Sequence, residues 1–336
     1  MRRLPVSALV LLMAGTSART SAATSPPTGS PSTSPEQPSI GVQPPIGAPI
    51  DVASLEGRIA FSDETEDVWI AAADGSRPRR LTRGRAQEFD PTLAPDGRVA
   101  YRHQPGDDDT TEIYLMNADG SGERSLTAND VADWGPDWSS DGRSIVWNSA
   151  VGVFFGFSAF VMRPDGSDVR RITKHYVEYP AWSPDDSRIA FMAQEPGASG
   201  SNPNYNIFVM DADGSNIRRL TTASGSDGWP AWSPDGSQIV FASARDDCSV
   251  SQAADCLSTG DIGPWHDVWT MSADGSHQRR VTTGFGQFFA WSPDGREIMV
   301  AGASSLYVIR PDGSGKADVP IDGVAHPLFP DWIAAR

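Results

Sequence analysis

Short apolar runs that begin on a polar residue recur along most of the chain, each between two turn sequences. Residues 188–191, 206–209 and 238–241 are examples, with isoleucine, valine or phenylalanine after the first position. β-Branched and aromatic residues favour strands. The flanking Pro-Asp-Gly and Ala-Asp-Gly-Ser sequences favour tight turns, because proline presets φ and glycine accepts a positive φ. The pattern predicts short antiparallel strands joined by hairpins.

The turn sequence Asp-Gly-Ser divides the chain into repeats of similar length. Its aspartates are 45, 46, 48, 61 and 38 residues apart, at Asp74, Asp119, Asp165, Asp213, Asp274 and Asp312. A repeat also contains a Pro-x-Trp-Ser strand, an apolar second strand, a third strand and a short outer strand such as 218–221. A period of roughly 40–50 residues with strand-like content is typical of a β-propeller, in which each repeat is one blade.

The two ends of the repeat region complete one repeat between them. Residues 57–61 resemble a second strand without an innermost strand before it, and residues 329–334 an innermost strand without a partner after it. Pairing them would cover strand edges that are otherwise exposed. The sequence therefore predicts an all-β fold, a six-bladed β-propeller of four-stranded antiparallel blades over residues 54–336, closed by N- and C-terminal strands that share one blade. Six large side chains are expected to pack between blades: Leu93, Trp138, Trp182, Trp232, Trp291 and Trp332.

The first 53 residues are predicted to precede the propeller. Arg2 and Arg3 come before a short apolar run, and residues 21–23 offer a small-residue cleavage site, so residues 1–23 are interpreted as a signal peptide. The apolar run is too short to span a bilayer, although an uncleaved anchor is the alternative. Residues 24–53 are rich in proline, serine and threonine, which predicts a disordered linker, either a spacer or a proline-rich ligand. These features favour a periplasmic, cell-wall-associated or secreted protein without membrane insertion.

Charge and cysteine content narrow the expected partners. The net charge is −16 and would become −19 if Arg2, Arg3 and Arg19 left with the signal peptide. Because phosphate binding needs lysine and arginine patches, this acidity argues against nucleic acid or anionic lipid. Cys248 and Cys256 lie in the longest loop and are expected to form a disulfide in an oxidising compartment. A metal site is a poor alternative, because two thiols supply half a ligand set.

Two strings carry a family resemblance. PAWSPDGSQIVF (230–241) and IFVMDADGSNIRRLT (207–221) resemble the TolB-like propeller repeat, an exported bacterial relative of the WD-repeat, and the resemblance covers about residues 57–334. It implies a six-bladed propeller and protein association at the cell envelope. TolB itself carries an α/β domain ahead of its propeller, whereas the linker takes that place here, so the resemblance is to the propeller alone. Similar repeats also form the propellers of prolyl-oligopeptidase-type hydrolases and of some polysaccharide lyases.

The predicted connections differ between the two faces of the ring. First-to-second and third-to-fourth turns are uniformly short, whereas second-to-third connections run from a few residues near Gly302 to about 25 over residues 242–266. Individual loops on a rigid scaffold are where binding usually occurs. We therefore place the functional surface on the face of the second-to-third loops, called here the variable-loop face.

The links before the innermost strands carry acidic and aromatic residues near the predicted channel mouth on that face. The candidate binding residues are Glu88, Asp90, Asp133, Trp134, Glu178, Tyr179, Asp227 and Trp229, with Phe89 and Phe289 beside them. Glu88, Asp133 and Asp227 could hold a hard cation such as Ca²⁺, and the rings could hold a cationic ligand. The alternative is that the rings pack in the core or rim and the acids are merely solvated.

Other segments of this face are further candidates. Residues 151–157 are an apolar run containing Phe154 and Phe155, which would dock a partner if exposed and would fill the face if folded inward. Trp265 and His266 end the longest loop. The Asp-x-Asp-Gly strings, as at 211–214, lack the further acids of a calcium loop and are interpreted as hairpin turns.

Catalytic motifs are sparse in this sequence. It has no Gly-x-Ser-x-Gly or His-Glu-x-x-His string, while His103, His175 and His326 lie in or beside the variable loops. The favoured hypothesis is a monomeric, non-catalytic exported propeller, without a required cofactor, that binds a protein or a cell-surface glycan. The alternative is a propeller-type enzyme, a polysaccharide lyase or hydrolase relative with a His/carboxylate site at the channel mouth.

Overall fold

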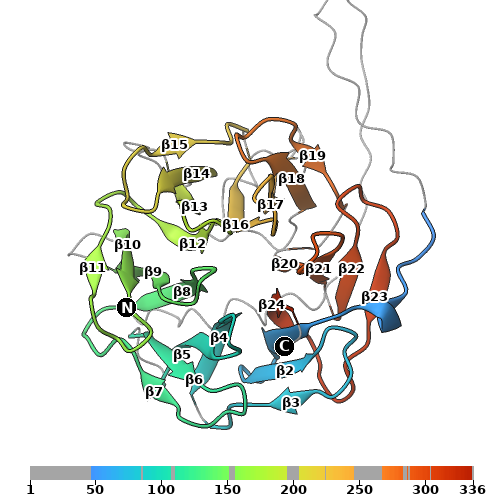
Figure 1. Cartoon of the computed structure of the whole chain (residues 1–336), viewed down its shortest axis with the longest axis horizontal. Helices are drawn as coiled ribbons and strands as arrows, with labels where there is room; N and C mark the ends of the chain where they lie inside the picture. The colour runs from blue at the N-terminus through green and yellow to red at the C-terminus, as the bar shows by residue number, and fades with distance from the viewer. Residues whose placement is uncertain are drawn as a thin grey trace, which may run out of the picture. The chain divides into compact units, whose positions relative to one another are not determined.

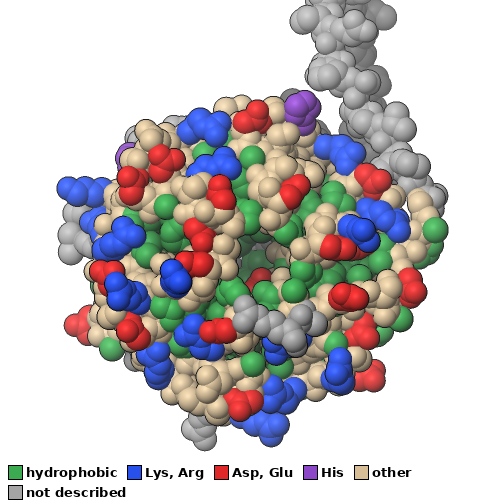
Figure 2. Space-filling model, viewed as in Figure 1, with side chains coloured by type: hydrophobic (Ala, Val, Ile, Leu, Met, Phe, Trp, Pro, Cys, Tyr) green, Lys and Arg blue, Asp and Glu red, His purple; other side chains and the backbone are tan. Residues whose placement is uncertain are grey.

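The computed structural model describes residues 47–334, except 85, 107–109, 151–155, 195–203, 224, 246–266, 283–285, 287 and 303. Six four-stranded antiparallel sheets form a ring around a central hollow (Figures 1 and 2). The predicted six-bladed β-propeller is confirmed. Within this part of the chain the regular elements are strands, apart from one short 3-10 turn, η2 (Val52–Ser54).

The blades are numbered here from the shared one, and their strands are given from the channel outward. Blade one contains β24 (Leu328–Ile333), β1 (Arg58–Ser62), β2 (Val68–Ala72) and β3 (Arg79–Arg80), and blade two contains β4 (Gln87–Leu93), β5 (Val99–Gln104), β6 (Glu112–Met116) and β7 (Arg124–Ser125). Blade three contains β8 (Asp133–Trp138), β9 (Ile145–Ala150), β10 (Phe157–Met162) and β11 (Arg170–Arg171), and blade four contains β12 (Glu178–Trp182), β13 (Arg188–Gln194), β14 (Tyr205–Asp211) and β15 (Arg218–Arg219). Blade five contains β16 (Asp227–Trp232), β17 (Gln238–Ser243), β18 (Asp267–Ser272) and β19 (Arg279–Arg280), and blade six contains β20 (Phe289–Trp291), β21 (Ile298–Ala301), β22 (Leu306–Ile309) and β23 (Ala317–Val319).

The ring closes in blade one, as predicted. β24 pairs antiparallel with β1, with Arg58 opposite Ile333 and Ile59 opposite Trp332. The carboxylate of Asp331 on β24 accepts a hydrogen bond from the Leu93 N–H at 2.6 Å, which joins blade one to blade two. The last strand therefore both completes its own sheet and contacts the next one.

The repeated turn sequences owe their shape to aspartate and serine side chains. In all six Asp-Gly-Ser turns the serine N–H donates to the aspartate Oδ1 at 2.9 Å, namely in Ser76, Ser121, Ser167, Ser215, Ser276 and Ser314. The glycine of each turn has a φ between 79° and 90°, which glycine adopts without strain. Hydrogen bonds from the serine hold the pKa of Asp213 and its equivalents below the usual value. The hairpin interpretation of residues 211–214 is confirmed.

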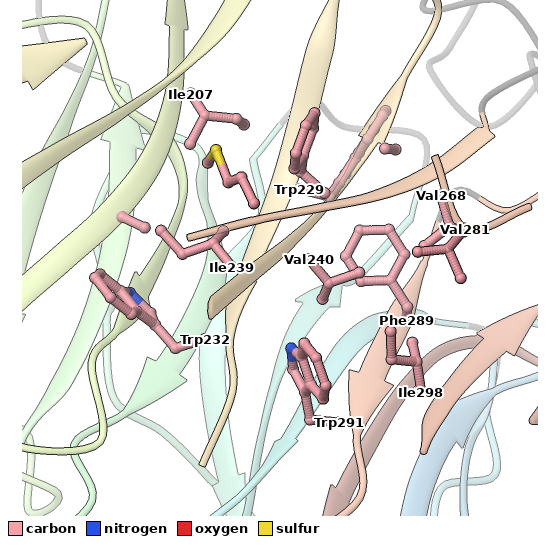
Figure 3. Packing of buried hydrophobic residues seen from close by; sticks show 14 of the residues in the cluster. Ile207, Trp229, Trp232, Ile239, Val240, Val268, Val281, Phe289, Trp291 and Ile298 are labelled. Atoms are coloured by element: carbon pink, nitrogen blue, oxygen red, sulfur yellow. The ribbon is translucent and has the colours of Figure 1, made fainter. Parts of the chain in front are cut away.

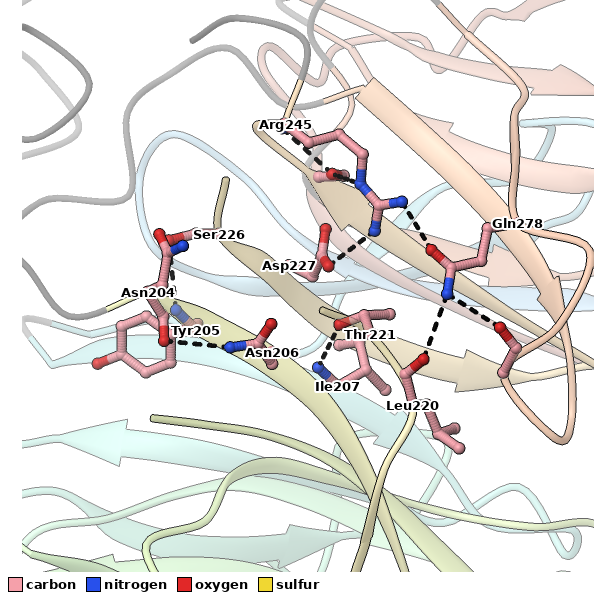
Figure 4. Close-up of polar contacts among 12 residues, drawn as sticks. Asn204, Tyr205, Asn206, Ile207, Leu220, Thr221, Ser226, Asp227, Arg245 and Gln278 are labelled. Atoms are coloured by element: carbon pink, nitrogen blue, oxygen red, sulfur yellow. Dashed lines mark hydrogen bonds and ion pairs between the residues drawn. The ribbon is translucent and has the colours of Figure 1, made fainter. Parts of the chain in front are cut away.

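The Arg-Arg-x-Thr string fastens the outer strand to the third strand. The Thr221 hydroxyl accepts a hydrogen bond from the Ile207 N–H at 3.0 Å (Figure 4). Equivalent bonds join Thr82 to Val68 at 2.8 Å and Thr282 to Val268 at 3.0 Å. A two-residue strand thus gains a side-chain bond beyond its short backbone ladder.

The hydrophobic core lies between neighbouring blades. The Trp232 indole of blade five donates to the Ala181 carbonyl of blade four at 3.2 Å, and Trp291 of blade six donates to Ala231 of blade five at 3.2 Å. Figure 3 shows Trp232 and Trp291 packed among aliphatic side chains such as Ile239 and Val240. The predicted inter-blade packing is confirmed at these positions.

The segment just before blade one contacts blade six. The Ile50 N–H donates to the Gly315 carbonyl at 2.9 Å, and Arg310 donates to the Ala48 carbonyl at 3.1 Å. Ile50 is buried in the cluster that blades one and six share. The last part of the predicted linker thus packs on the propeller, while the predicted signal peptide and residues 24–46 lie outside the described residues.

The strand bounds agree with the predicted difference between the two faces. First-to-second turns occupy residues 94–98, 139–144, 183–187, 233–237 and 292–297, whereas second-to-third connections range from 302–305 to 244–266. We call the face of the short turns the hairpin face. In the described part of the chain, no helix is both long and apolar enough to cross a bilayer.

Candidate functional site

The channel mouth on the variable-loop face is formed where the innermost strands begin. Asp90, Tyr179, Trp229 and Phe329 each precede a proline and have φ between 46° and 51°. Such values are uncommon for residues other than glycine. In β4, β12 and β16 the register with the second strand shifts at this point. A local irregularity of this kind re-aims side chains, and here side chains from different blades meet.

Four aromatic side chains from four blades form a cluster, called here the mouth cluster: Tyr179, Trp229, Phe288 and Phe329. Ring centroids are 5.7 Å apart for Tyr179 and Trp229, and 5.6 Å apart for Trp229 and Phe288. Phe288 and Phe329 are 3.8 Å apart. Trp229 is buried, while the other three rings keep partial exposure. The structure therefore brings the predicted Tyr179 and Trp229 together with two residues that the sequence reasoning missed.

A buried ion pair on blade two lies beside the mouth cluster. Arg102 Nε is 3.3 Å from Asp90 Oδ2, and both side chains are largely buried. The Arg102 guanidinium also lies over the Phe89 ring, 4.5 Å from its centroid. Burial raises the pKa of Asp90, while the charge of Arg102 and the Gly135 backbone oppose this rise. Asp90 also influences the pKa of Tyr179, which places this carboxylate near the cluster.

Glu88, Asp133 and Asp227 do not converge on a common site. Each is buried and bonded within its own blade: Glu88 Oε1 is 3.2 Å from His103 Nδ1, Asp133 accepts from the Trp147 indole at 3.0 Å, and Asp227 is 2.7 Å from Arg245. Figure 4 shows the last pair, in which Arg245 also donates to Gln278 at 2.7 Å. Among the described residues, no three His, Cys, Asp or Glu side chains are grouped closely enough to hold a metal ion. The structure therefore does not bring together the three carboxylates that were predicted to hold Ca²⁺, because each contacts a partner within its own blade.

The remaining candidates are dispersed. Glu178 is buried and accepts hydrogen bonds from the hydroxyls of Tyr176 and Tyr205, and its burial raises its pKa. Trp134 packs on Phe157 with centroids 4.5 Å apart. The other named positions lie outside the described residues: Phe154, Phe155, Trp265, His266, Cys248 and Cys256.

The three histidines considered for catalysis have separate surroundings. His103 pairs with Glu88 and stacks on Tyr114 at 4.1 Å between centroids. His326 is exposed, 3.8 Å from Glu64. His175 is exposed in the link before blade four. The channel mouth thus offers aromatic stacking surface and one buried carboxylate–guanidinium pair.

The channel end at the hairpin face carries two carboxylates that the sequence reasoning missed. Asp137 on blade three accepts from the Trp182 N–H at 2.6 Å, as Asp331 on blade one does from Leu93. Both lie on innermost strands, with a whole blade between them along the ring. Burial raises the pKa of Asp137 to about 7, and the backbone bond from Trp182 only partly offsets this.

Comparisons with known proteins agree with this architecture. Residues 173–252 match the family model described as the TolB beta propeller domain. TolB from Acinetobacter baumannii is 19% identical with a TM-score of 0.64, over 82% of this chain and 66% of that one. The putative TolB from Agrobacterium tumefaciens is 23% identical with a TM-score of 0.55, over 71% of this chain and 87% of that one. An oligogalacturonate lyase from Vibrio parahaemolyticus is 12% identical with a TM-score of 0.50, over 79% and 80% of the two chains. No curated protein matched the sequence.

Proposed function

Because this chain forms a TolB-like propeller, we propose that it acts without catalysis, as an exported module that binds a protein or a cell-surface glycan through its variable-loop face. The mouth cluster is the observation that carries the proposal. Tyr179, Phe288 and Phe329 meet at the channel opening and remain partly exposed. Aromatic side chains supply large contact area and prefer pockets in which a partner removes them from water. Export is inferred from the predicted signal peptide.

The chemistry of the mouth favours a partner that inserts a flat or extended apolar group. The rings offer stacking and edge-to-face contacts. The carboxylate of Asp90 is already compensated by Arg102 at 3.3 Å. Binding therefore gains chiefly from apolar burial, as for an aromatic or proline side chain of a protein, or the apolar face of a sugar ring.

The experiment is affinity capture from cell-envelope extracts with the full chain, in parallel with a defined glycan array. Phe288→Ala is the test variant, and Val169→Ala, at a side chain that is 53% exposed on the hairpin face, is the matched control. We expect the same partner to be retained by the wild type and by Val169→Ala, and its yield to fall at least tenfold for Phe288→Ala. Thermal melting of each variant shows that the fold is kept.

Two results would contradict the proposal. One is equal capture by the wild type and Phe288→Ala, which would remove the mouth cluster from binding. The other is cleavage of a uronate polymer, followed by the ultraviolet absorbance of unsaturated products and abolished by His103→Ala. That outcome would favour the enzymatic alternative built on Glu88 and His103.

A further inference from the structure

A cavity of about 650 Å³ lies on the hairpin face between blades two and three. Its floor includes the buried Val161 and Met162. Five arginines line it: Arg98, Arg124, Arg143, Arg163 and Arg170. On the face seen in Figure 2, basic and acidic side chains are interspersed over the region that β7 to β11 occupy in Figure 1. The volume is within the roughly 300–1,000 Å³ usual for small-molecule sites.

The local charge of this cavity opposes that of the chain. Its lining contains five arginines and two aspartates, a formal balance of +3, whereas the whole chain carries −16. The carboxylates nearby compensate the guanidinium groups unevenly. Arg98 pairs with Asp96 at 2.8 Å, whereas Arg163 is 3.6 Å from Asp168 and Arg143 is 3.8 Å from Asp141. Arg124 donates to the backbone carbonyl of Pro164 at 2.6 Å and has no carboxylate partner within the part of the chain that the structure describes.

Arg170 departs from the pattern of the other blades. The first arginine of the outer strand normally donates to a backbone carbonyl in the third-to-fourth turn of the next blade, as Arg79 does to Ala118, Arg218 to Asp274 and Arg279 to Pro311. Among the described residues, the Arg170 side chain has no hydrogen bond or ion pair. After the hydrogen bonds from Ser215, its charge also helps to lower the pKa of Asp213 in the corresponding turn of blade four. Its exposed guanidinium at the cavity wall donates no hydrogen bond there, so a ligand in the cavity would share its charge with Asp213.

Blade six shows how the same arrangement is neutralised from within. Arg143 and Arg163 on blade three correspond to Arg296 and Arg310 on blade six, at the same places in the Asp-Gly-Arg and Arg-Pro-Asp-Gly turns. On blade six the next residue is Glu297, which interacts electrostatically with both arginines.

Blade three has Ser144 at the place of Glu297, in the same backbone geometry. The Ser144 and Glu297 N–H groups each donate to the serine hydroxyl of their own turn at 2.9 Å. Blade three thus keeps the two arginines and lacks the anion.

We propose that the cavity between blades two and three binds a small, multiply charged oxyanion, with phosphate or carboxylate groups that supply the charge Glu297 supplies on blade six. Guanidinium groups bind both kinds of group through paired N–H donors. The volume exceeds that of a single phosphate. Asp96 and Asp141 pair with two of the lining arginines and offset part of the formal charge of +3. The net charge of −16 disfavours binding of polyanions to most of the surface, so binding here requires the positive charge of the arginines that line this cavity.

The test is isothermal titration calorimetry of the full chain with tripolyphosphate and with citrate, at low salt. Ser144→Glu places on blade three the carboxylate found on blade six, and Arg170→Ala removes the exposed guanidinium. Arg296→Ala on blade six is the matched control, because all three variants change the net charge by −1. Ser144→Gln tests the size of the new side chain without its charge.

We expect Ser144→Glu and Arg170→Ala to weaken binding at least tenfold, and Arg296→Ala and Ser144→Gln to stay within about threefold of the wild type. Tighter binding of tripolyphosphate would assign the site to phosphate ligands, and tighter binding of citrate to carboxylate ligands. Absence of heat with both probes, or an equal loss in Arg296→Ala and Arg170→Ala, would overturn the proposal. The two faces are tested independently, so this result does not depend on the mouth cluster.

Discussion

Carboxylates near the channel differ in what compensates their burial. Asp227 has Arg245 at 2.7 Å, and Asp90 has Arg102 at 3.3 Å. Asp137 forms no ion pair with any described residue and accepts a hydrogen bond from the backbone N–H of Trp182. Because a hydrogen bond from a neutral donor stabilises an ionised carboxylate less than a paired cation does, burial leaves Asp137 with a pKa of about 7.

Stability of the propeller should therefore carry a component that decreases as pH rises. In the fold Asp137 keeps its proton up to about pH 7, whereas in the unfolded chain it loses the proton near pH 3.8. Between these values the native state binds more protons, so the free energy of unfolding falls with pH. Asp137→Asn keeps an acceptor for Trp182 and removes the titration. We expect the free energy of unfolding of Asp137→Asn to exceed that of the wild type by about 1–2 kcal/mol at pH 8, a value reduced to allow for water in the channel. At pH 4 the two free energies should be equal.

Urea unfolding across this pH range checks the effect, and Asp185→Asn is a control of opposite sign. Hydroxyl bonds from Ser183 and Ser187 lower the pKa of Asp185 to about 2. The ionised Asp185 carboxylate therefore stabilises the fold above pH 3.8, its pKa in the unfolded chain, and this stabilisation is lost as the pH falls toward about 2. Asp185→Asn should accordingly lower the free energy of unfolding at neutral pH. Parallel pH curves for the wild type and Asp137→Asn would contradict the interpretation of Asp137.

Residue identity alone did not predict which polar groups would meet. Glu88, Asp133 and Asp227 precede the innermost strands in the sequence, which suggested one funnel. Their actual partners, such as Arg245, come from the second strand or the loop after it. A pairing of this kind depends on strand register and on side-chain direction, which composition does not fix.

Among the structural elements, the short outer strands depend most on side-chain bonds. β15 comprises Arg218 and Arg219 alone, and its backbone pairs with Phe208 and Val209. The Thr221 hydroxyl, fully buried, adds the bond from the Ile207 N–H. The same device recurs in other blades, which explains why threonine follows the two arginines in the repeat.

Thr221→Val should show what this bond contributes. Valine has the same shape but leaves the buried Ile207 N–H without an acceptor, at a cost of about 1–3 kcal/mol. Thr221→Ser keeps the hydroxyl and loses a methyl group, so we expect a loss below about 1 kcal/mol. Chemical denaturation midpoints of the two variants compare them directly. A valine variant as stable as the serine variant would show that the hydroxyl is dispensable.

Element positions were largely predictable, because each blade repeats its turn chemistry and its strands are bounded by proline, aspartate and glycine. The mouth cluster was predicted only in part. Phe329 precedes Pro330 as Tyr179 precedes Pro180, a signal present in the sequence. The positive φ that turns these residues toward one another is uncommon for aromatic residues, so strand periodicity did not indicate it.

For the whole molecule, closure through β24 determines whether six sheets form one cooperative body. β1 would expose an unpaired edge without β24. Trp332 and Asp331 would be lost with it, and with them the contacts to Glu56 and Leu93. Loss of the Asp331 contact weakens the interface between blades one and two, and loss of the Trp332 contact frees the segment before β1.

Deletion of residues 328–336 should therefore yield a protein that aggregates or unfolds without a cooperative transition. A synthetic peptide of residues 326–336, added in trans, should restore a monomeric peak in size-exclusion chromatography and a sigmoidal melting curve. The same peptide with Trp332→Ala is the control and should fail to restore them. A cooperative, monomeric deletion variant would show that the ring does not depend on this closure.

The antiparallel pairing of Arg58 with Ile333 has a consequence for how such a ring can be connected. In blades two to six a short turn joins the first two strands, whereas in blade one the two strands come from opposite ends of the repeat region. The location of the break is thus independent of the contacts that hold the sheets together. Circular permutation, with a Pro-Asp-Gly turn bridging β24 and β1 and new termini opened in a link between any two blades, would preserve every inter-blade interface. The six-bladed ring should therefore form whichever blade is assembled from the two ends of the chain.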